Sequence, residues 1–152
     1  MLEPALWPAL ALAALGAGLD IWQRKLSNVL CLTLAAASVG AVVYLHGPGL
    51  AMWGFVHAII ALIIGMALFK FDIIGGGDAK FYAAAALGVP GLPMASPFAL
   101  LGWTAASGFL LVFAMMASRV VRKGASRQGL LKGWSVPYGV AIAAGLWLAH
   151  LV

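Results

Sequence analysis

The chain has very little charge of either sign. Only four of its 152 residues are acidic and nine are basic, so that charged residues make up 9% of the sequence, whereas a soluble domain has about 25%. Hydrophobic residues make up 64%, and the mean hydropathy is +1.07. This composition excludes an ordinary soluble domain and predicts an all-α integral membrane protein. We expect a single domain over residues 1–152, since the length leaves no room for a second one beside the spanning helices.

The chain also lacks the residues of a disulfide framework or a metal cluster. Its one cysteine, Cys31, lies within an apolar run, which excludes an intramolecular disulfide and favours a buried, unreactive thiol. The three histidines, His46, His57 and His150, are far apart and have no metal-ligand spacing. We therefore expect no metal site and no cofactor.

Long apolar runs, separated by Gly, Pro or charged residues, predict six membrane-spanning helices. Most are long enough to cross a hydrocarbon core of ~30 Å at ~1.5 Å per residue, although the fourth is short. The first run is preceded by Glu3 and by no basic residue, so we interpret it as a retained helix and not as a signal peptide. The predicted spans are Ala5–Trp22, Asn28–Tyr44, Leu50–Phe69, Ala79–Val89, Phe98–Ala117 and Val136–Val152.

All nine basic residues lie in alternate connections between these spans. The positive-inside rule therefore places three connections in the cytoplasm and both termini outside. The net charge of +5 is then an orientation signal that also attracts anionic lipid headgroups, and it does not indicate nucleic-acid binding. The basic residues are Arg24, Lys25, Lys70, Lys80, Arg119, Arg122, Lys123, Arg127 and Lys132.

Two carboxylates are expected on the cytoplasmic side of this arrangement. Asp20 lies near the end of the first span and Asp78 opens the fourth, so that the fold can bring them together although they are 58 positions apart (78 minus 20). Two charges ~4 Å apart in an effective dielectric of ~20 would repel by about 4 kcal/mol, or ~3 pKa units, and would share one proton near neutral pH. A protonated and an ionised carboxyl group are the general acid and general base of an aspartic protease.

Three glycines, Gly75, Gly76 and Gly77, directly precede Asp78. Without Cβ atoms they can adopt positive φ and let an extended substrate strand approach the carboxylate. Irregular backbone at membrane depth is tolerated where it lines a cavity or is buried in protein. We expect this segment to shape a site.

Each acidic residue also has a structural interpretation. Asp20 and Arg24 form an i,i+4 pair worth about 0.2–0.5 kcal/mol, and Asp78 could simply cap the fourth helix, for about 1 kcal/mol. Asp72, beside Lys70, is interpreted as an interfacial charge and not as the second catalytic group. The same two carboxylates could instead bind a proton or cation in a small transporter, or be retained in a non-catalytic assembly partner.

These motifs resemble those of the type IV prepilin peptidases, which are GxGD intramembrane aspartic peptidases. Gly75–Lys80 resembles the GxGD-plus-lysine motif, and Asp20 followed by Leu26–Asn28 resembles the first aspartate with its Pro-Asn. Val136–Ala141 is similar to the Pro-Tyr-Gly segment of the last helix. The three motifs occur in the family's order.

The resemblance implies an aspartic endopeptidase of the bacterial inner membrane, with Asp20 and Asp78 as the catalytic pair and Gly75–Gly77 shaping the site. Its substrate would be a prepilin whose basic leader stays in the cytoplasm and is cut off at the inner membrane boundary. Lys80 or Lys132 could pair with an acidic residue downstream of the cut. The expected partners are a prepilin and lipid, with no nucleic acid, and the oligomeric state stays open.

The chain departs from the family pattern in two respects. Ser27 stands where the family has Pro, which removes a fixed φ but keeps a hydroxyl that can cap the second span, so we expect a geometric effect without loss of activity. Larger members carry a cytoplasmic domain with zinc-binding cysteines and an N-methyltransferase activity, which this chain lacks. It therefore resembles the short, peptidase-only enzymes of tight-adherence (Flp-type) pilus systems.

Overall fold

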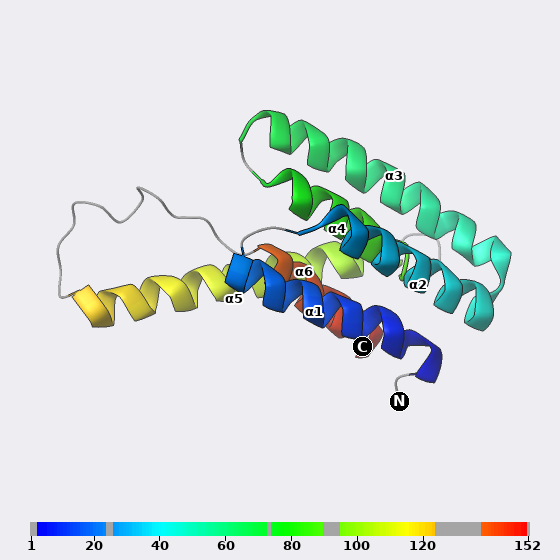
Figure 1. The fold of residues 1–152 in the computed structure, drawn as a ribbon, viewed down its shortest axis with the longest axis horizontal. Helices are drawn as coiled ribbons and strands as arrows, with labels where there is room; N and C mark the ends of the chain where they lie inside the picture. The colour runs from blue at the N-terminus through cyan, green and yellow to red at the C-terminus, as the bar shows by residue number, and fades with distance from the viewer. Residues whose placement is uncertain (1–2, 24–25, 73, 90–94, 124–137, 152) are drawn as a thin grey trace.

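The computed structural model describes residues 3–23, 26–72, 74–89, 95–123 and 138–151. All regular elements in this part of the chain are helices, which confirms the all-α prediction (Figure 1). They are the 3₁₀-helix η1 (Pro4–Leu6) and the α-helices α1 (Trp7–Gln23), α2 (Asn28–His46), α3 (Pro48–Lys70), α4 (Gly76–Ala86), α5 (Ala95–Lys123) and α6 (Tyr138–Leu151).

Each α-helix occupies one of the six predicted spans, but several ends differ. The largest change relative to length is in α4, which begins at Gly76 where the prediction began at Ala79. Gly75 is extended and its carbonyl oxygen accepts the Ala79 N–H at 3.2 Å, so that the helix starts before the carboxylate. Asp78 therefore lies inside the first turn of α4. Predictions for Arg24, Lys25 and Lys132 fall outside the described residues.

Three of the described helices are long and apolar enough to cross a bilayer: Pro4–Gln23, Asn28–His46 and Pro48–Lys70. Phe98–Ala114 and Tyr138–Leu151 are shorter apolar segments. The protein is an all-α membrane protein. With 11 residues, α4 is only ~16 Å long, so it needs its neighbours to bury its ends.

Helices α2 and α3 are joined through a single residue, Gly47. Its φ of 81° falls in the left-handed region, which glycine adopts without the steric cost of a Cβ. Pro48 follows as the first residue of α3, where its missing N–H is not needed for helix hydrogen bonding. This tight connection returns α3 alongside α2.

The short helix α4 lies at the centre of the packing. It contacts α2, α3 and α6, while α1 packs on α2 and α6, and α5 packs along α6. Phe81 of α4 is fully buried and is the largest such side chain. The other fully buried large side chains are Leu10, Leu34, Val42, Leu100 and Leu146.

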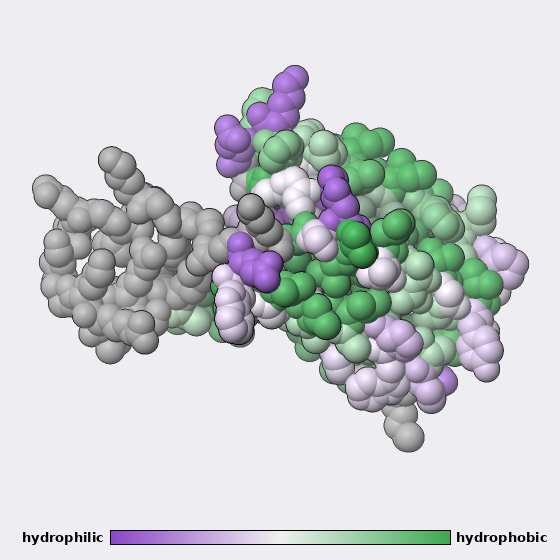
Figure 2. All heavy atoms as spheres, in the orientation of Figure 1, coloured by the Kyte–Doolittle hydropathy of each residue, from purple (hydrophilic) through white to green (hydrophobic). Residues whose placement is uncertain are grey.

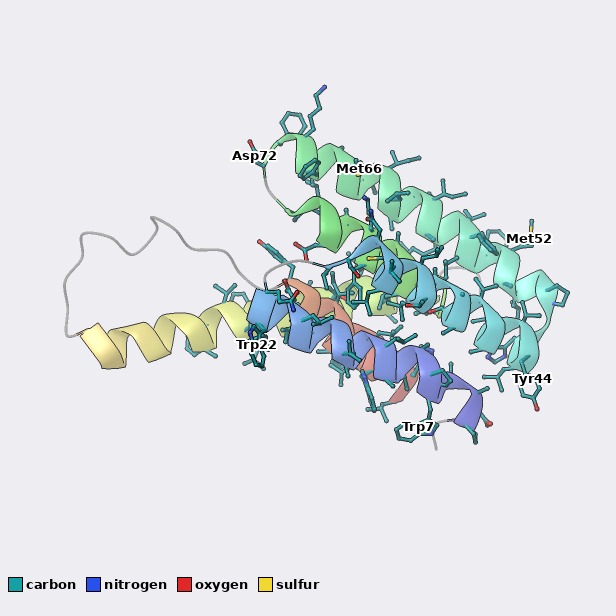
Figure 3. The ribbon with its side chains drawn as sticks, in the orientation of Figure 1. Trp7, Trp22, Tyr44, Met52, Met66 and Asp72 are labelled. Atoms are coloured by element: carbon teal, nitrogen blue, oxygen red, sulfur yellow. The ribbon has the colours of Figure 1, made fainter. Side chains whose placement is uncertain are left out.

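The two ends of the bundle carry different residues. Trp7 and Trp22 stand at opposite ends of α1, as expected for indoles at the two membrane interfaces (Figure 3). Asp72 lies at the same end as Trp22, and Tyr44 lies at the end of Trp7 (Figure 3). Hydrophobic side chains cover most of the visible described surface, and the most hydrophilic residues gather toward the end where α1 and α3 finish (Figure 2).

Candidate active site

Asp20 is a buried carboxylate on α1, with only 6% of its surface exposed. Its Oδ2 accepts a hydrogen bond of 2.8 Å from the backbone N–H of Gly139, in the first turn of α6. First-turn N–H groups have no partner within their own helix, and the positive end of the helix dipole favours a negative charge there. The start of α6 therefore holds the Asp20 carboxylate in place.

Gly139 is required at this contact because α1 and α6 approach closely. A Cβ at this position would lie 2.9 Å from Asp20 Oδ2 and 3.0 Å from Asp20 Cβ. Sequence reasoning did not assign Gly139 a role in the site. The signal that could have found it was the resemblance of Val136–Ala141 to the Pro-Tyr-Gly segment.

Asp78 is the third residue of α4, and its carboxylate accepts a hydrogen bond from the backbone N–H of Gly75. Gly75 is the N-cap, so this contact is the half of a capping box in which the third residue reaches back. The Asp78 side chain therefore both caps α4 and presents its carboxylate to the site.

Of the three glycines before Asp78, Gly75 is the one at which a close neighbour leaves no room for a Cβ. Gly47 has the only positive φ among the described glycines, so the expectation of positive φ at Gly75–Gly77 was wrong. A Cβ at Gly75 would lie 2.7 Å from Asp78 Oδ2, which would push the carboxylate away. Gly77 lies against Leu26, at 3.4 Å from a built Cβ. Asp78 and Leu26 therefore lie close to this glycine segment.

The structure brings Asp20 and Asp78 together. The Asp20 carboxylate is close enough to interact electrostatically with that of Asp78. The Phe81 ring of α4 would lie 2.5 Å from a Cβ built on Gly16 of α1, so this ring spans the space between the two helices. Residues three or four apart share a face of a helix. Gly16 and Asp20 therefore share one face of α1, Asp78 and Phe81 share one face of α4, and these faces meet.

The motif Gly75–Lys80 also contacts the segment Leu26–Asn28 that follows Asp20. Lys80 Nζ donates to Asn28 Oδ1 at 3.1 Å, which joins the start of α2 to the first turns of α4. Ser27 is the N-cap of α2, and its hydroxyl accepts the Leu30 N–H at 3.2 Å. The predicted capping role of Ser27 is confirmed.

Asp72 lies apart from this pair. It is exposed at the end of α3 with a φ of 56°, and in Figure 3 it points away from the bundle. Among the described residues, no group of three or more His, Cys, Asp or Glu is arranged to hold a metal ion. His150 instead contacts the Gly88 carbonyl oxygen through Nε2 at 2.9 Å.

The fold is that of a helical membrane protein, and its two neighbouring carboxylates, each placed by a backbone N–H and a close glycine, form a candidate functional site. The type IV leader peptidase family matches residues 7–118, which include both aspartates and the segment Gly75–Lys80. The chain belongs to this family, so it is a prepilin leader peptidase in general terms and its family implies a prepilin substrate.

Comparison with curated proteins and with solved structures gives no match. Family membership favours peptide hydrolysis over the transporter interpretation of the same carboxylates.

Proposed function

We propose that this protein is an aspartic endopeptidase that removes the basic leader from Flp-type prepilins, with Asp20 and Asp78 as its catalytic pair. The observation that carries the proposal is the approach of these two carboxylates from helices α1 and α4. Family membership supports the leader-peptidase activity.

In this mechanism Asp20 is the general base and Asp78 the general acid. The Gly139 N–H and the start of α6 support a charged Asp20 carboxylate, and repulsion between two close charges keeps one proton on Asp78. Asp20 takes a proton from a water, whose oxygen attacks the peptide carbonyl carbon while Asp78 protonates the carbonyl oxygen. Asp20 then gives its proton to the amide nitrogen while Asp78 takes one back from a hydroxyl of the tetrahedral diol, and the C–N bond breaks to release the amine and the carboxylic acid. Both carboxyl groups are then in their starting states.

The topology follows from the charges. Six spans with both termini outside would place the basic connections, and therefore Asp20 and Asp78, at the cytoplasmic face of the bacterial inner membrane. The gathering of hydrophilic residues at the end where α1 and α3 finish supports this orientation (Figure 2). Lys80 is exposed there and uses one of its three donors on Asn28, so it can also meet an acidic substrate residue.

Co-expression with a Flp-type prepilin tests the proposal. Asp20→Asn and Asp78→Asn should each slow leader removal by about 100- to 10,000-fold, the usual contribution of general acid–base catalysis, and uncut precursor should accumulate. Asp72→Asn is the matched control, because Asp72 is exposed and lies in the same segment of the chain. Normal processing by either Asp20→Asn or Asp78→Asn would contradict the proposal, as would an equal loss in all three variants.

A further inference from the structure

A large cleft opens beside Asp78. Its volume is about 930 Å³, and its walls come from α3 and α4 on one side and from α5 and α6 on the other. Asp78 and Tyr138 line it where α4 and α6 begin, and Trp53 and Phe98 line it at the opposite end. From Trp53 to Leu68 along α3 the cleft extends over ~22 Å, which is most of the hydrocarbon thickness of a bilayer.

Two apolar helix faces form the long walls of the cleft. Val56, Ile60 and Ile64 line it from α3 at intervals of four residues, and Leu101, Ala105 and Phe109 line it from α5 at the same interval. Such spacing defines one face of each helix. Ile64 is 54% exposed and Phe109 is 76% exposed. The side chains of these two helix faces are therefore not packed against other described residues. Their geometry fits an apolar helix lying lengthwise between α3 and α5.

Two residues that line the cleft each carry a buried polar atom. His57 Nδ1 on α3 and Thr104 Oγ1 on α5 are buried and have no hydrogen-bond partner among the described residues. A lipid acyl chain cannot satisfy them. A transmembrane peptide can offer a partner to His57, because Ser, Thr, Asn or Gln side chains and exposed carbonyls of small residues hydrogen-bond across helix interfaces. Thr104 Oγ1 lies against Gly145 of α6. An unpartnered polar atom in an apolar medium costs free energy, which such a helix would recover.

We propose that this cleft holds the apolar helix of the prepilin substrate, with its leader end at Asp78. The proposal rests on the proposed function, because it takes the bond next to Asp78 as the one that is cut. A prepilin offers a basic leader followed by an apolar helix, and the cleft offers a carboxylate followed by an apolar channel in the same order. The cleft thus recognises the part of the substrate that remains in the membrane.

Two prepilin-derived probes separate this inference from the catalytic one. The first is the full-length Flp-type precursor in lipid vesicles, and the second is a peptide with the same leader and cut site but only the first turn of the helix. Ala105→Trp fills the cleft from α5, and Ala106→Trp is its matched control, because Ala106 is exposed on the same helix but does not line the cleft.

We expect Ala105→Trp to slow cleavage of the full-length precursor by about tenfold or more, which is about 1.4 kcal/mol, and to leave cleavage of the short peptide unchanged. Ala106→Trp should cleave both normally. If Ala105→Trp cleaves both probes like wild type, or loses both equally, the cleft is not the helix site. The catalytic proposal fails separately, when wild type cleaves neither probe.

Photo-crosslinking provides a measurement that does not depend on blocking the cleft. With p-benzoylphenylalanine in place of Phe109, in an Asp20→Asn background that retains uncut precursor, we expect a crosslink to the helix of the full-length precursor. The same group in place of Leu32, which is 72% exposed on α2, should give none. A crosslink from position 109 to lipid alone, or equal crosslinks from both positions, would overturn the inference.

Discussion

Helices α3 and α4 pack against each other but differ in how large a share of their residues they bury. α3 has 23 residues and buries only four, all of them Ala or Gly, while its large apolar side chains stay exposed. α4 has 11 residues and buries six, including the ring of Phe81. In a bilayer, lipid is as apolar as a protein interior, so burial follows size and shape more than polarity. The most apolar helix is therefore peripheral, and the central helix α4 carries the Asp78 carboxylate.

The largest expected effect comes from removing the fully buried ring of the central helix. Phe81→Ala should lower the free energy of unfolding by about 3–5 kcal/mol, because the ring is fully buried against Gly16 and its loss leaves a cavity. Phe55→Ala on α3 is the control, since that ring is 45% exposed and should cost far less. Denaturant titration in detergent micelles measures both. Equal losses would show that the two helices do not differ as proposed.

A smaller effect is expected where the buried interior meets Asp20, one of the two proposed catalytic residues. Gly139→Ala should place a methyl group 2.9 Å from Asp20 Oδ2 and displace the carboxylate. Because a displacement of ~1 Å can cost about 100-fold in rate, we expect kcat for precursor cleavage to fall by about that factor with KM unchanged. Gly40→Ala on α2 has open space around it and should keep wild-type kinetics. A change confined to KM would mean that Gly139 acts on substrate binding and does not position Asp20.

The sequence predicted the helices better than the contacts among them. Hydropathy found six apolar segments, and the rarity of acidic residues singled out Asp20 and Asp78, because charges are costly in lipid. The hydroxyl of Ser27 also suffices to predict its capping role, since a cap is local.

The contact between Gly139 and Asp20 joins residues 119 positions apart and depends on the packing of α1 against α6, which hydropathy does not register. The start of α4 was also missed, because the tight approach of Gly75 to Asp78 has no signature beyond the glycine itself.

The junction before α2 belongs to neither the dense interior nor the cleft, and it should respond only to local changes. Ser27→Ala removes the acceptor of the Leu30 N–H and should lower the free energy of unfolding by about 1 kcal/mol, with precursor cleavage unchanged. Ser27→Pro, the residue usual in the family, should cost less, because the φ of −72° at this position suits a proline ring. Thermal unfolding and cleavage measured on the same preparations test both. Loss of cleavage in Ser27→Ala at temperatures where it is folded would place the cap within the catalytic machinery.

The smallest effect is expected at Thr104, a residue that lines the cleft. Its substitution should raise the stability of the free enzyme but weaken its binding of the precursor. Thr104→Val replaces an unpartnered buried hydroxyl by a methyl group of similar shape, so the free enzyme should become more stable by up to about 1 kcal/mol. If the hydroxyl bonds to the substrate helix, the same change should weaken binding of the full-length precursor by about 0.6 kcal/mol, or roughly threefold in KM, the average for hydrogen bonds between membrane helices. Ser107→Ala is the control, because its hydroxyl already bonds to the Ala141 carbonyl oxygen at 2.9 Å and its loss should destabilise the free enzyme. A Thr104→Val enzyme that is more stable and binds precursor as well as wild type would show that the hydroxyl has no partner in the complex either.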